Sequence, residues 1–283
     1  MNSVCYRGRH VFGAALAYAA LFAGCARHQA LRQPDAAAEF RSASVVGYLP
    51  FQTLPNSRAL VPPPPAEGSE ALALDLDYSR RSLALRDSAA WTLAISDAYL
   101  MFPHAAGTFS CALNAPVTAE DTPHLYVLLR RSLIDAGLST YAAKNYYQRP
   151  RPFLSNKEPI CTPAAQGRLE ENGSYPSAHG AIGMAWAIIL AELSPEHAAE
   201  ILVRGQAFGL SRVVCNAHWY SDVIQGRNMA SATVAKLRAS PAFLADFRAA
   251  KAELAAVRRK DLKPLRACRS EAAAVALQRS LAR

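Results

Sequence analysis

The chain has 283 residues, 51% of them apolar, so it can bury one substantial core and we expect a single domain after processing. Downstream of residue 24 it has no uninterrupted apolar run of about 18 residues, which excludes a protein that crosses a membrane several times. Its formal net charge of +9 suits an anionic substrate.

Residues 1–24 form the first predicted element, an export signal. Two arginines precede an uncharged apolar run that is too short to span a membrane comfortably, as is typical of a signal peptide. Residues 22–25 resemble a bacterial lipoprotein cleavage box in which Cys25 is lipidated, and ordinary cleavage after Ala26 is the alternative. Either route predicts a periplasmic or secreted protein, anchored in the outer membrane if Cys25 carries a lipid.

Export also affects how the cysteines are interpreted. Structural disulfides are expected in an oxidising compartment, and the sequence has no C-x-x-C pair that would indicate zinc or redox chemistry. We therefore expect no metal site and no cofactor. Four cysteines remain after processing and allow three connectivities. They are Cys111, Cys161, Cys215 and Cys268.

The rest of the chain is predicted to be helical. An extended N-terminal arm covers residues 25–60, and a proline run follows it at 62–65. After Ser69 the sequence is rich in Ala, Leu and Arg and lacks the alternating pattern of strands. We therefore expect an all-α domain, a multi-helix bundle, over residues 61–260, with a C-terminal extension over 261–283.

Capping hydroxyls and prolines mark the helix boundaries. At three helix starts a hydroxyl residue directly precedes a proline at the first helical position, as at Thr122-Pro123. Pro150 and Pro152 are expected to end the helix before them, and a long loop then runs to Tyr175. The predicted helices cover residues 123–147, 177–193, 195–212, 218–238 and 241–260.

Two groups of residues in these elements form a predicted anion site. Lys144 and Arg151 are seven residues apart, about two helical turns, so a helix end and its proline-fixed exit can point both cations at one anion. Ser177 stands where a helix N-cap belongs, so its amide and those of Ala178 and His179 are expected to lack intrahelical partners. Such amides, together with the helix dipole, attract phosphate.

A third group adds a histidine with an orienting carboxylate. His218 and Asp222 are four residues apart, one turn along the same helix face, so the carboxylate can accept the imidazole proton and leave the other nitrogen free to attack. Arg212 is six positions before His218, on a different side of a continuous helix, so we expect a break near residues 215–217. Each feature alone also fits an ordinary surface or cap, but their conjunction fits phosphoryl transfer without a metal.

Together the three groups resemble the signature of the superfamily that contains the type 2 phosphatidic acid phosphatases and the vanadium haloperoxidases. Within it the chain is similar to the bacterial class A non-specific acid phosphatases, from Leu60 to about Leu254. The family usually has glycine where this chain has Ala178, a change that keeps the amide donor but adds a methyl group beside the phosphate. The resemblance also implies a homodimer or a larger assembly.

The resemblance implies a metal-independent acid phosphatase, a phosphoric monoester hydrolase, that works through a phosphohistidine. His218 would attack phosphorus, Asp222 would orient it, and His179 would protonate the departing alcohol. The other site residues would hold the phosphate oxygens through cationic groups, a hydroxyl and backbone amides. They are Lys144, Arg151, Ser177, Ala178 and Arg212.

Broad specificity is expected, with nucleotides, sugar phosphates and aryl phosphates as substrates, phosphotransfer to alcohols as a competing reaction, and no nucleic-acid partner. Two other functions stay open at this point. The same residues can hold vanadate in a haloperoxidase, and a catalytically idle phosphate-binding lipoprotein is also consistent with Ala178 and Cys25. A bridge between Cys161 and Cys215, which lie close to these motifs, would tie down the loop before Tyr175.

Overall fold

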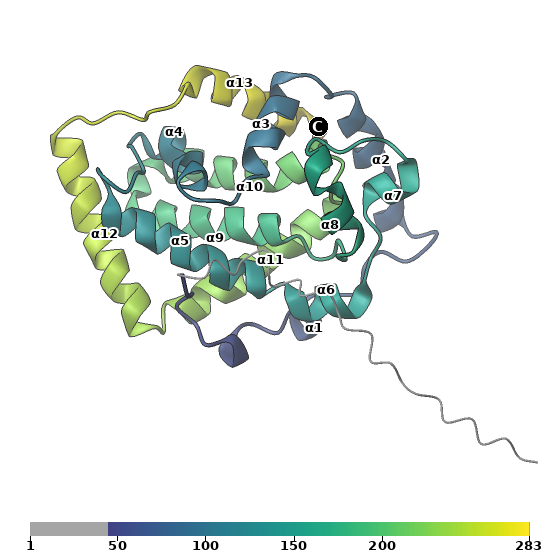
Figure 1. Cartoon of the computed structure of the whole chain (residues 1–283), viewed down its shortest axis with the longest axis horizontal. Coiled ribbons are helices and arrows are strands. Elements are labelled where there is room, and N and C mark those ends of the chain that lie inside the picture. The colour runs from purple at the N-terminus through teal and green to yellow at the C-terminus, as the bar shows by residue number, and fades with distance from the viewer. Residues whose placement is uncertain (1–44, 283) are drawn as a thin grey trace, which may run out of the picture. The chain divides into compact units, whose positions relative to one another are not determined.

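The computed structural model describes residues 45–282, so the predicted signal peptide and Cys25 lie outside the described residues (Figure 1). Within this range the chain forms helices and no strand, which confirms the all-α prediction. No helix in the described part combines the length and apolar character that a membrane crossing requires. The α-helices are α1 (Ser57–Leu60), α2 (Glu70–Leu83), α3 (Ala89–Asp97), α4 (Ser110–Leu113), α5 (Pro123–Leu138), α6 (Tyr141–Tyr147), α7 (Pro152–Asn156), α8 (Gln166–Glu170), α9 (Ala178–Leu193), α10 (Ala198–Val214), α11 (Tyr220–Leu237), α12 (Pro241–Arg259) and α13 (Cys268–Arg279).

Helix α9 is the centre of the core. It packs against α5, α10 and α11, and 12 of its 16 residues are buried (Figure 1). Its large apolar side chains, such as Trp186 and Ile189, are buried. The burial of this apolar surface is the main contribution that stabilises the packing of the surrounding helices. A Cβ atom at Gly226 would lie 2.3 Å from the Ser177 carbonyl oxygen, so only glycine lets α11 approach the start of α9 this closely.

The helix predicted over residues 123–147 is divided into α5 and α6, which corrects the prediction. At the junction the hydroxyls of Ser139 and Thr140 donate to backbone carbonyls one turn earlier, at 2.8 and 2.7 Å. Local bonds of this kind compete with continued helical pairing. Helix α6 therefore starts as a separate element at Tyr141, and it carries Lys144.

Two further parts of the prediction differ from the structure. The long loop before Tyr175 contains the short helices α7 and α8. Residues 195–197 form a 3-10 turn, so α10 begins at Ala198. Pro195 fixes φ at the first helical position but does not by itself select i→i−4 hydrogen bonds. The first turn here has the tighter i→i−3 bonds of a 3-10 helix.

The predicted break before His218 is confirmed between α10 and α11. The amides of Ala217 and His218 both donate to the carbonyl of Arg212, at 3.0 and 3.1 Å, and Asn216 adopts a left-handed φ of 60°. Helix α11 then begins at Tyr220 rather than at 218. This tight turn brings the side chains of Arg212 and His218 to one side of the bundle.

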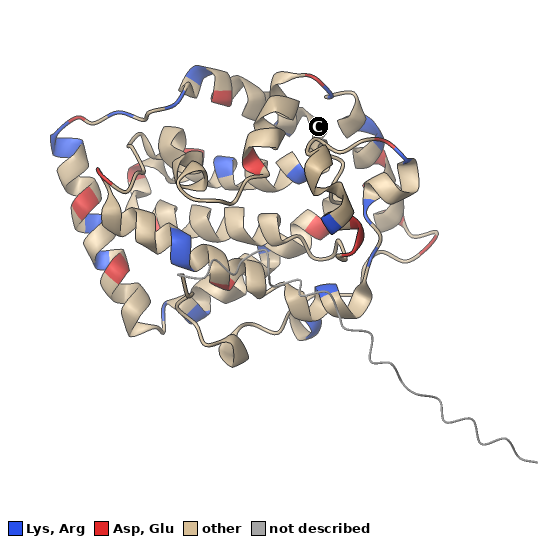
Figure 2. Ribbon diagram, in the orientation of Figure 1, with Lys and Arg blue, Asp and Glu red and all other residues tan. Residues whose placement is uncertain are grey.

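Both ends of the described chain pack on the bundle. The amides of Tyr48 and Leu49 donate to the carboxylate of Asp135 on α5, at 2.8 and 3.1 Å. Helix α13 packs against α3 and α10, and the disulfide Cys111–Cys268 joins it to α4. Basic and acidic residues are both present along α12 (Figure 2), as expected of a solvated helix face.

Candidate active site

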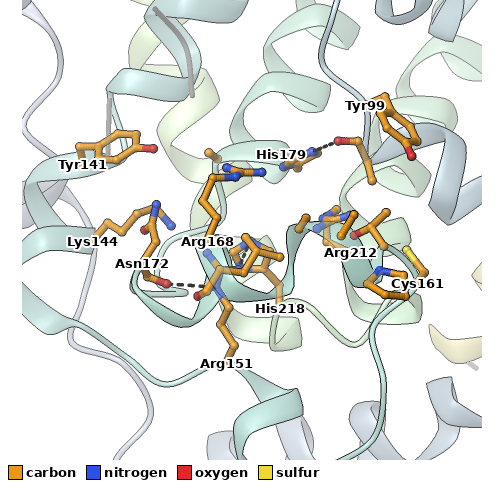
Figure 3. Close-up of a pocket in the computed structure, with 17 residues that line it drawn as sticks. Tyr99, Tyr141, Lys144, Arg151, Cys161, Arg168, Asn172, His179, Arg212 and His218 are labelled. Atoms are coloured by element: carbon orange, nitrogen blue, oxygen red, sulfur yellow. Dashed lines mark hydrogen bonds between the residues drawn. The ribbon is translucent and has the colours of Figure 1, made fainter. Parts of the chain in front are cut away.

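A cavity of about 350 Å³ collects side chains from α6, α8, α9 and α10 and from the turns that join the helices. Figure 3 shows the cationic side chains and both histidine rings converging on it. Two of the predicted site residues, Ser177 and Asp222, are buried behind the cavity wall. The predicted residues that line the cavity are Lys144, Arg151, Ala178, His179, Arg212 and His218.

Backbone carbonyls hold Lys144 and Arg151 at the cavity. Both residues are only 2% exposed. The Lys144 ammonium donates to the carbonyl of Gly173 at 2.9 Å, and Nε of Arg151 donates to the carbonyls of Leu169 and Asn172 at 2.9 and 3.0 Å. A carbonyl, unlike a carboxylate, positions a cation without cancelling its charge. The two cations are therefore fixed in direction and still able to attract an anion.

The start of α9 is built as an N-cap, with one correction to the sequence analysis. Oγ of Ser177 accepts the amide of Gly180 at 3.2 Å, as expected of a capping serine. The Ser177 amide donates to the backbone carbonyl of Asp222 at 2.9 Å, because α11 packs closely at this point. The three amides expected to face a ligand are therefore reduced to those of Ala178 and His179.

His218 is oriented by bonds at both ring nitrogens. Nδ1 lies 3.2 Å from Oδ2 of Asp222, and Nε2 lies 3.1 Å from a terminal nitrogen of Arg151. Because a guanidinium group can only donate, Nε2 is the acceptor, and Nδ1–H donates to Asp222. His218 lies before α11 and not within it as expected, but the pair still meets because Asp222 in the first turn also accepts the amide of Trp219 at 2.9 Å.

Burial and neighbouring cations keep both cavity histidines neutral. Burial lowers the pKa of His218 well below its ordinary value, and the charges of Arg151, Lys144 and Arg212 lower it further. Burial also lowers the pKa of His179, with Arg212 and His218 acting in the same direction. A neutral imidazole whose Nε2 carries a lone pair is the form of histidine that acts as a nucleophile.

His179 is held by a backbone group and by an aromatic ring. Its Nε2 lies 3.3 Å from the carbonyl oxygen of Ala98, the residue that caps the end of α3 (Figure 3). Since a carbonyl only accepts, Nε2 donates and Nδ1 is the nitrogen left to exchange a proton. The imidazole also stacks on Phe208, with ring centroids 5.9 Å apart and an interplanar angle of 24°.

Comparisons with known proteins show which family the chain belongs to. Residues 125–241 match the model of the PAP2 superfamily. An acid phosphatase of Zymomonas mobilis is 42% identical over 192 residues, which cover 68% of this chain and 73% of that protein. This chain belongs to the PAP2 superfamily. A non-specific acid phosphatase of Providencia stuartii is 40% identical over 213 residues, covering 75% of this chain and 86% of that protein, and one of Salmonella typhimurium is 39% identical over 189 residues, covering 66% and 76%. These relatives confirm the resemblance to the bacterial class A acid phosphatases.

The sequence analysis missed two buried residues of this PAP2 site. Arg149 donates to Oδ1 of Asp222 and to Oδ2 of Asp75, both at 2.7 Å. Burial raises the pKa of Asp222, and the Arg149 charge opposes that shift and favours the carboxylate. Arg149 stands two positions before Arg151 in one Arg-Pro-Arg-Pro run, which was a usable signal. Asp75 has no local signal, since only its burial distinguishes it from other helical carboxylates.

The loop beside the PAP2 cavity is tied down by a disulfide. Of the three connectivities that the sequence left open, the structure has the pairs Cys161–Cys215 and Cys111–Cys268. Cys161 lines the cavity, and its amide donates to the carbonyl of Cys215 at 3.2 Å. The bridge thereby fastens the segment that carries Arg168 to the end of α10. Among the described residues, no group of three or more His, Cys, Asp or Glu side chains is arranged to hold a metal ion.

Proposed function

We propose that this protein hydrolyses phosphomonoesters through a phosphohistidine formed on His218. The observation that carries the proposal is the pair of bonds to this ring, because Asp222 accepts from Nδ1–H while Nε2 accepts from Arg151 at the cavity, a bond that Arg151 would give up to a bound phosphate. An imidazole held in this way presents its lone pair where basic side chains would hold a phosphorus atom. The relatives named as acid phosphatases support the phosphatase activity.

The phosphate group would be bound by charge and by backbone donors. The amides of Ala178 and His179 stand at the positive end of α9, where an anion is favoured. Donors fixed in advance stabilise the transition state as charge spreads over the phosphate oxygens, and removal of one donor should lower kcat by roughly 10²- to 10³-fold. The side chains proposed to complete the site are those of Lys144, Arg151 and Arg212, which line the cavity. Ser177, predicted to join them, instead caps α9 behind the cavity wall.

The reaction would proceed in two displacements. In the first, Nε2 of His218 bonds to phosphorus as the bond to the ester oxygen breaks, and Nδ1–H of His179 gives its proton to that oxygen. In the second, His179 takes a proton from water while the water oxygen attacks phosphorus, the phosphorus–nitrogen bond breaks, and inorganic phosphate leaves. Asp222 balances the positive charge that His218 gains in between.

An acid pH optimum follows from the state required of His179. In the ligand-free site burial lowers its pKa, with Arg212 adding to the effect, so protonation needs an acid solution or a nearby anion. A bound phosphomonoester supplies that anion and raises the pKa of His179. We therefore expect the rate to fall toward alkaline pH, as His179 loses the proton that the leaving oxygen needs.

Broad specificity and export complete the proposal. The groups proposed above bind the phosphate, attack it or protonate the ester oxygen, none is assigned to the rest of the leaving group, and Tyr99 at the cavity is 54% exposed. Nucleotides, sugar phosphates and aryl phosphates are the proposed substrates, with alcohols competing with water as acceptors. We also propose a homo-oligomer that is exported through residues 1–24 and either released or anchored through a lipid on Cys25.

Phosphate release from p-nitrophenyl phosphate across pH tests the proposed function. We expect activity that survives EDTA and is lost to vanadate, which mimics the five-coordinate transition state. His218→Ala should lower kcat roughly 10⁴-fold or more and abolish the acid-labile label that radioactive substrate leaves on the protein. The exposed His124 offers a matched control, and His124→Ala should keep both signals. Turnover close to wild type in His218→Ala would exclude the mechanism.

A further inference from the structure

A buried polar network connects helix α13 to the wall of the cavity behind His179. Its five members are at most 9% exposed. Helices α3 and α13 lie outside residues 125–241, which match the family, and the proposed mechanism gives them no role. The members are Asp97 on α3, Arg204 and Ser211 on α10, and Glu271 and Gln278 on α13.

Arg204 is the centre of this network. Its two terminal nitrogens donate to the two oxygens of Asp97 at 3.0 and 2.5 Å, and its Nε donates to Oε1 of Glu271 at 3.3 Å. A planar guanidinium in a two-point bond fixes the direction of the carboxylate as well as its distance. Because Asp97 is the last residue of α3, these bonds set where that helix ends relative to α10 and α13.

Gln278 makes a second connection from α13. Its Nε2 donates to Oγ of Ser211 at 2.9 Å and to the carbonyl of Ala90 at 3.4 Å, and Ser211 in turn donates to Asp97 at 2.6 Å. Ala90 lies in the first turn of α3, and Asp97 ends the same helix. One side chain of α13 is therefore bonded to the start of α3 and, through Ser211, to its end.

The end of α3 carries the backbone group that contacts His179. Ala98 follows Asp97 directly, and its carbonyl accepts from Nε2 of His179 at 3.3 Å (Figure 3). Phe208 provides a second link between the network and His179. The Arg204 guanidinium lies 5.8 Å from the centroid of the Phe208 ring, and this ring stacks on the imidazole of His179. Displacement of α3 or of Arg204 would thus turn the His179 ring or remove its acceptor.

We propose that Glu271 and Gln278 are positioning residues for His179, because they hold α3 so that the Ala98 carbonyl keeps Nδ1 directed at the leaving oxygen. The inference rests on the proposed function, in which His179 is the general acid. It predicts a selective defect. A poor leaving group needs the proton from His179, whereas a leaving group that is stable as an anion does not.

The test compares two substrates in the full-length protein. The value of kcat/KM, which reports the first displacement, is measured with glycerol phosphate and with 2,4-dinitrophenyl phosphate. Glu271→Gln and Gln278→Met should each lose roughly tenfold or more on glycerol phosphate and stay within about twofold of wild type on the dinitrophenyl ester. In both variants, the alkaline limb of the pH profile of kcat/KM on glycerol phosphate should also move to lower pH. The control is Glu200→Gln, an exposed carboxylate on the same helix as Arg204 and beside α13, which should match wild type on both substrates.

The outcomes separate this inference from the proposed function. Equal losses on both substrates, or no loss on glycerol phosphate, would overturn the positioning role. If Glu271→Gln fails to fold by circular dichroism, Gln278→Met decides the question, because methionine keeps the volume and removes only the amide. His179→Ala should show the same selective defect in stronger form. If His179→Ala shows no selective defect, the acid role and the inference both fail. If His179→Ala shows the defect but the α13 variants keep the wild-type ratio of kcat/KM on the two substrates, only the inference fails.

Discussion

Arg149 and Arg204 are each buried between two carboxylates, but they reach the two cavity histidines in different ways. Arg149 bonds to Asp222, whose other oxygen accepts from His218, so the His218 ring is in contact with a negative charge. Arg204 bonds to the carboxylate at the end of α3, and the next residue presents an uncharged carbonyl to His179. One arrangement acts through charge and the other through orientation.

This difference suits the two proposed roles. A histidine that becomes phosphorylated gains positive charge, and a buried carboxylate stabilises that charge. A histidine that must give up a proton is better served by a carbonyl, because a carboxylate would hold the proton more tightly and make it a weaker acid. Two imidazoles in one cavity are thus distinguished by their partners, not by their burial.

The largest expected effect is at the charged contact. Asp222→Asn should lower kcat on 2,4-dinitrophenyl phosphate roughly 10⁴-fold, as with other amides that replace the carboxylate beside a catalytic histidine, because the amide no longer fixes the tautomer or balances the charge of His218. Steady-state kinetics measures the loss, with exposed Asp261→Asn as the control. A loss confined to poor leaving groups would contradict the distinction between the two histidines.

A smaller effect is expected when either arginine is removed. Arg149→Met and Arg204→Met should each lower the free energy of unfolding by about 3 kcal/mol, because each strands buried carboxylates without a partner. Their kinetic defects should differ, since Arg149→Met should lose activity on both phosphate esters and Arg204→Met mainly on glycerol phosphate. Urea unfolding and kcat/KM check both points, with exposed Arg269→Met as the control. If both variants lost activity on the two esters to the same extent, the proposed difference between the two arginines would be wrong.

The smallest expected effect is a pH dependence of stability in the ligand-free protein. Burial lowers the pKa of both His179 and His218 in the folded state, so the unfolded chain binds more protons below the ordinary value of 6.5. The free energy of unfolding should therefore fall as the pH drops below that value, by at most about 1.4 kcal/mol per pH unit for each histidine. His179→Gln should reduce the slope, and vanadate should oppose the decline by binding the folded state.

Asp135 contributes the opposite slope and needs its own control. Burial raises the pKa of Asp135 from 3.8 to about 6, while bonds from the amides of Tyr48 and Leu49 oppose the shift. Its contribution to stability is full below 3.8 and is lost as the pH rises through about 6. Urea unfolding of Asp135→Asn should thus show a steeper loss of stability on acidification than wild type. An unchanged slope would mean that Asp135 does not titrate in this range.

The parts of the site that sequence reasoning predicted are those with local signals. The spacing of His218 and Asp222 and the need to bring Arg212 beside them were enough to predict the pair and the helix break. The two arginine networks were missed because their members pair across sequence separations of 74 and 67 residues, as in Asp75–Arg149 and Arg204–Glu271. No helical periodicity or capping pattern in the sequence indicates partners so far apart.

Two local errors have different origins. The amide of Ser177 was expected to face a ligand, but the close approach of α11 at Gly226 brings a carbonyl of α11 to it. The helix predicted through Ser139 and Thr140 is interrupted because their hydroxyls bond to the preceding turn. Packing of a neighbouring helix decided the first outcome, and local side-chain bonds decided the second.

The disulfide between Cys111 and Cys268 closes a covalent ring across a sequence separation of 157 residues. Every residue that lines the active-site cavity lies inside this ring except Ala98 and Tyr99. A protease that cleaves one peptide bond within the ring therefore leaves both fragments on a single molecule, with α9, α10 and α11 still attached to it. Only a reductant releases the pieces, so a nicked protein can keep its cavity assembled wherever no reductant is present.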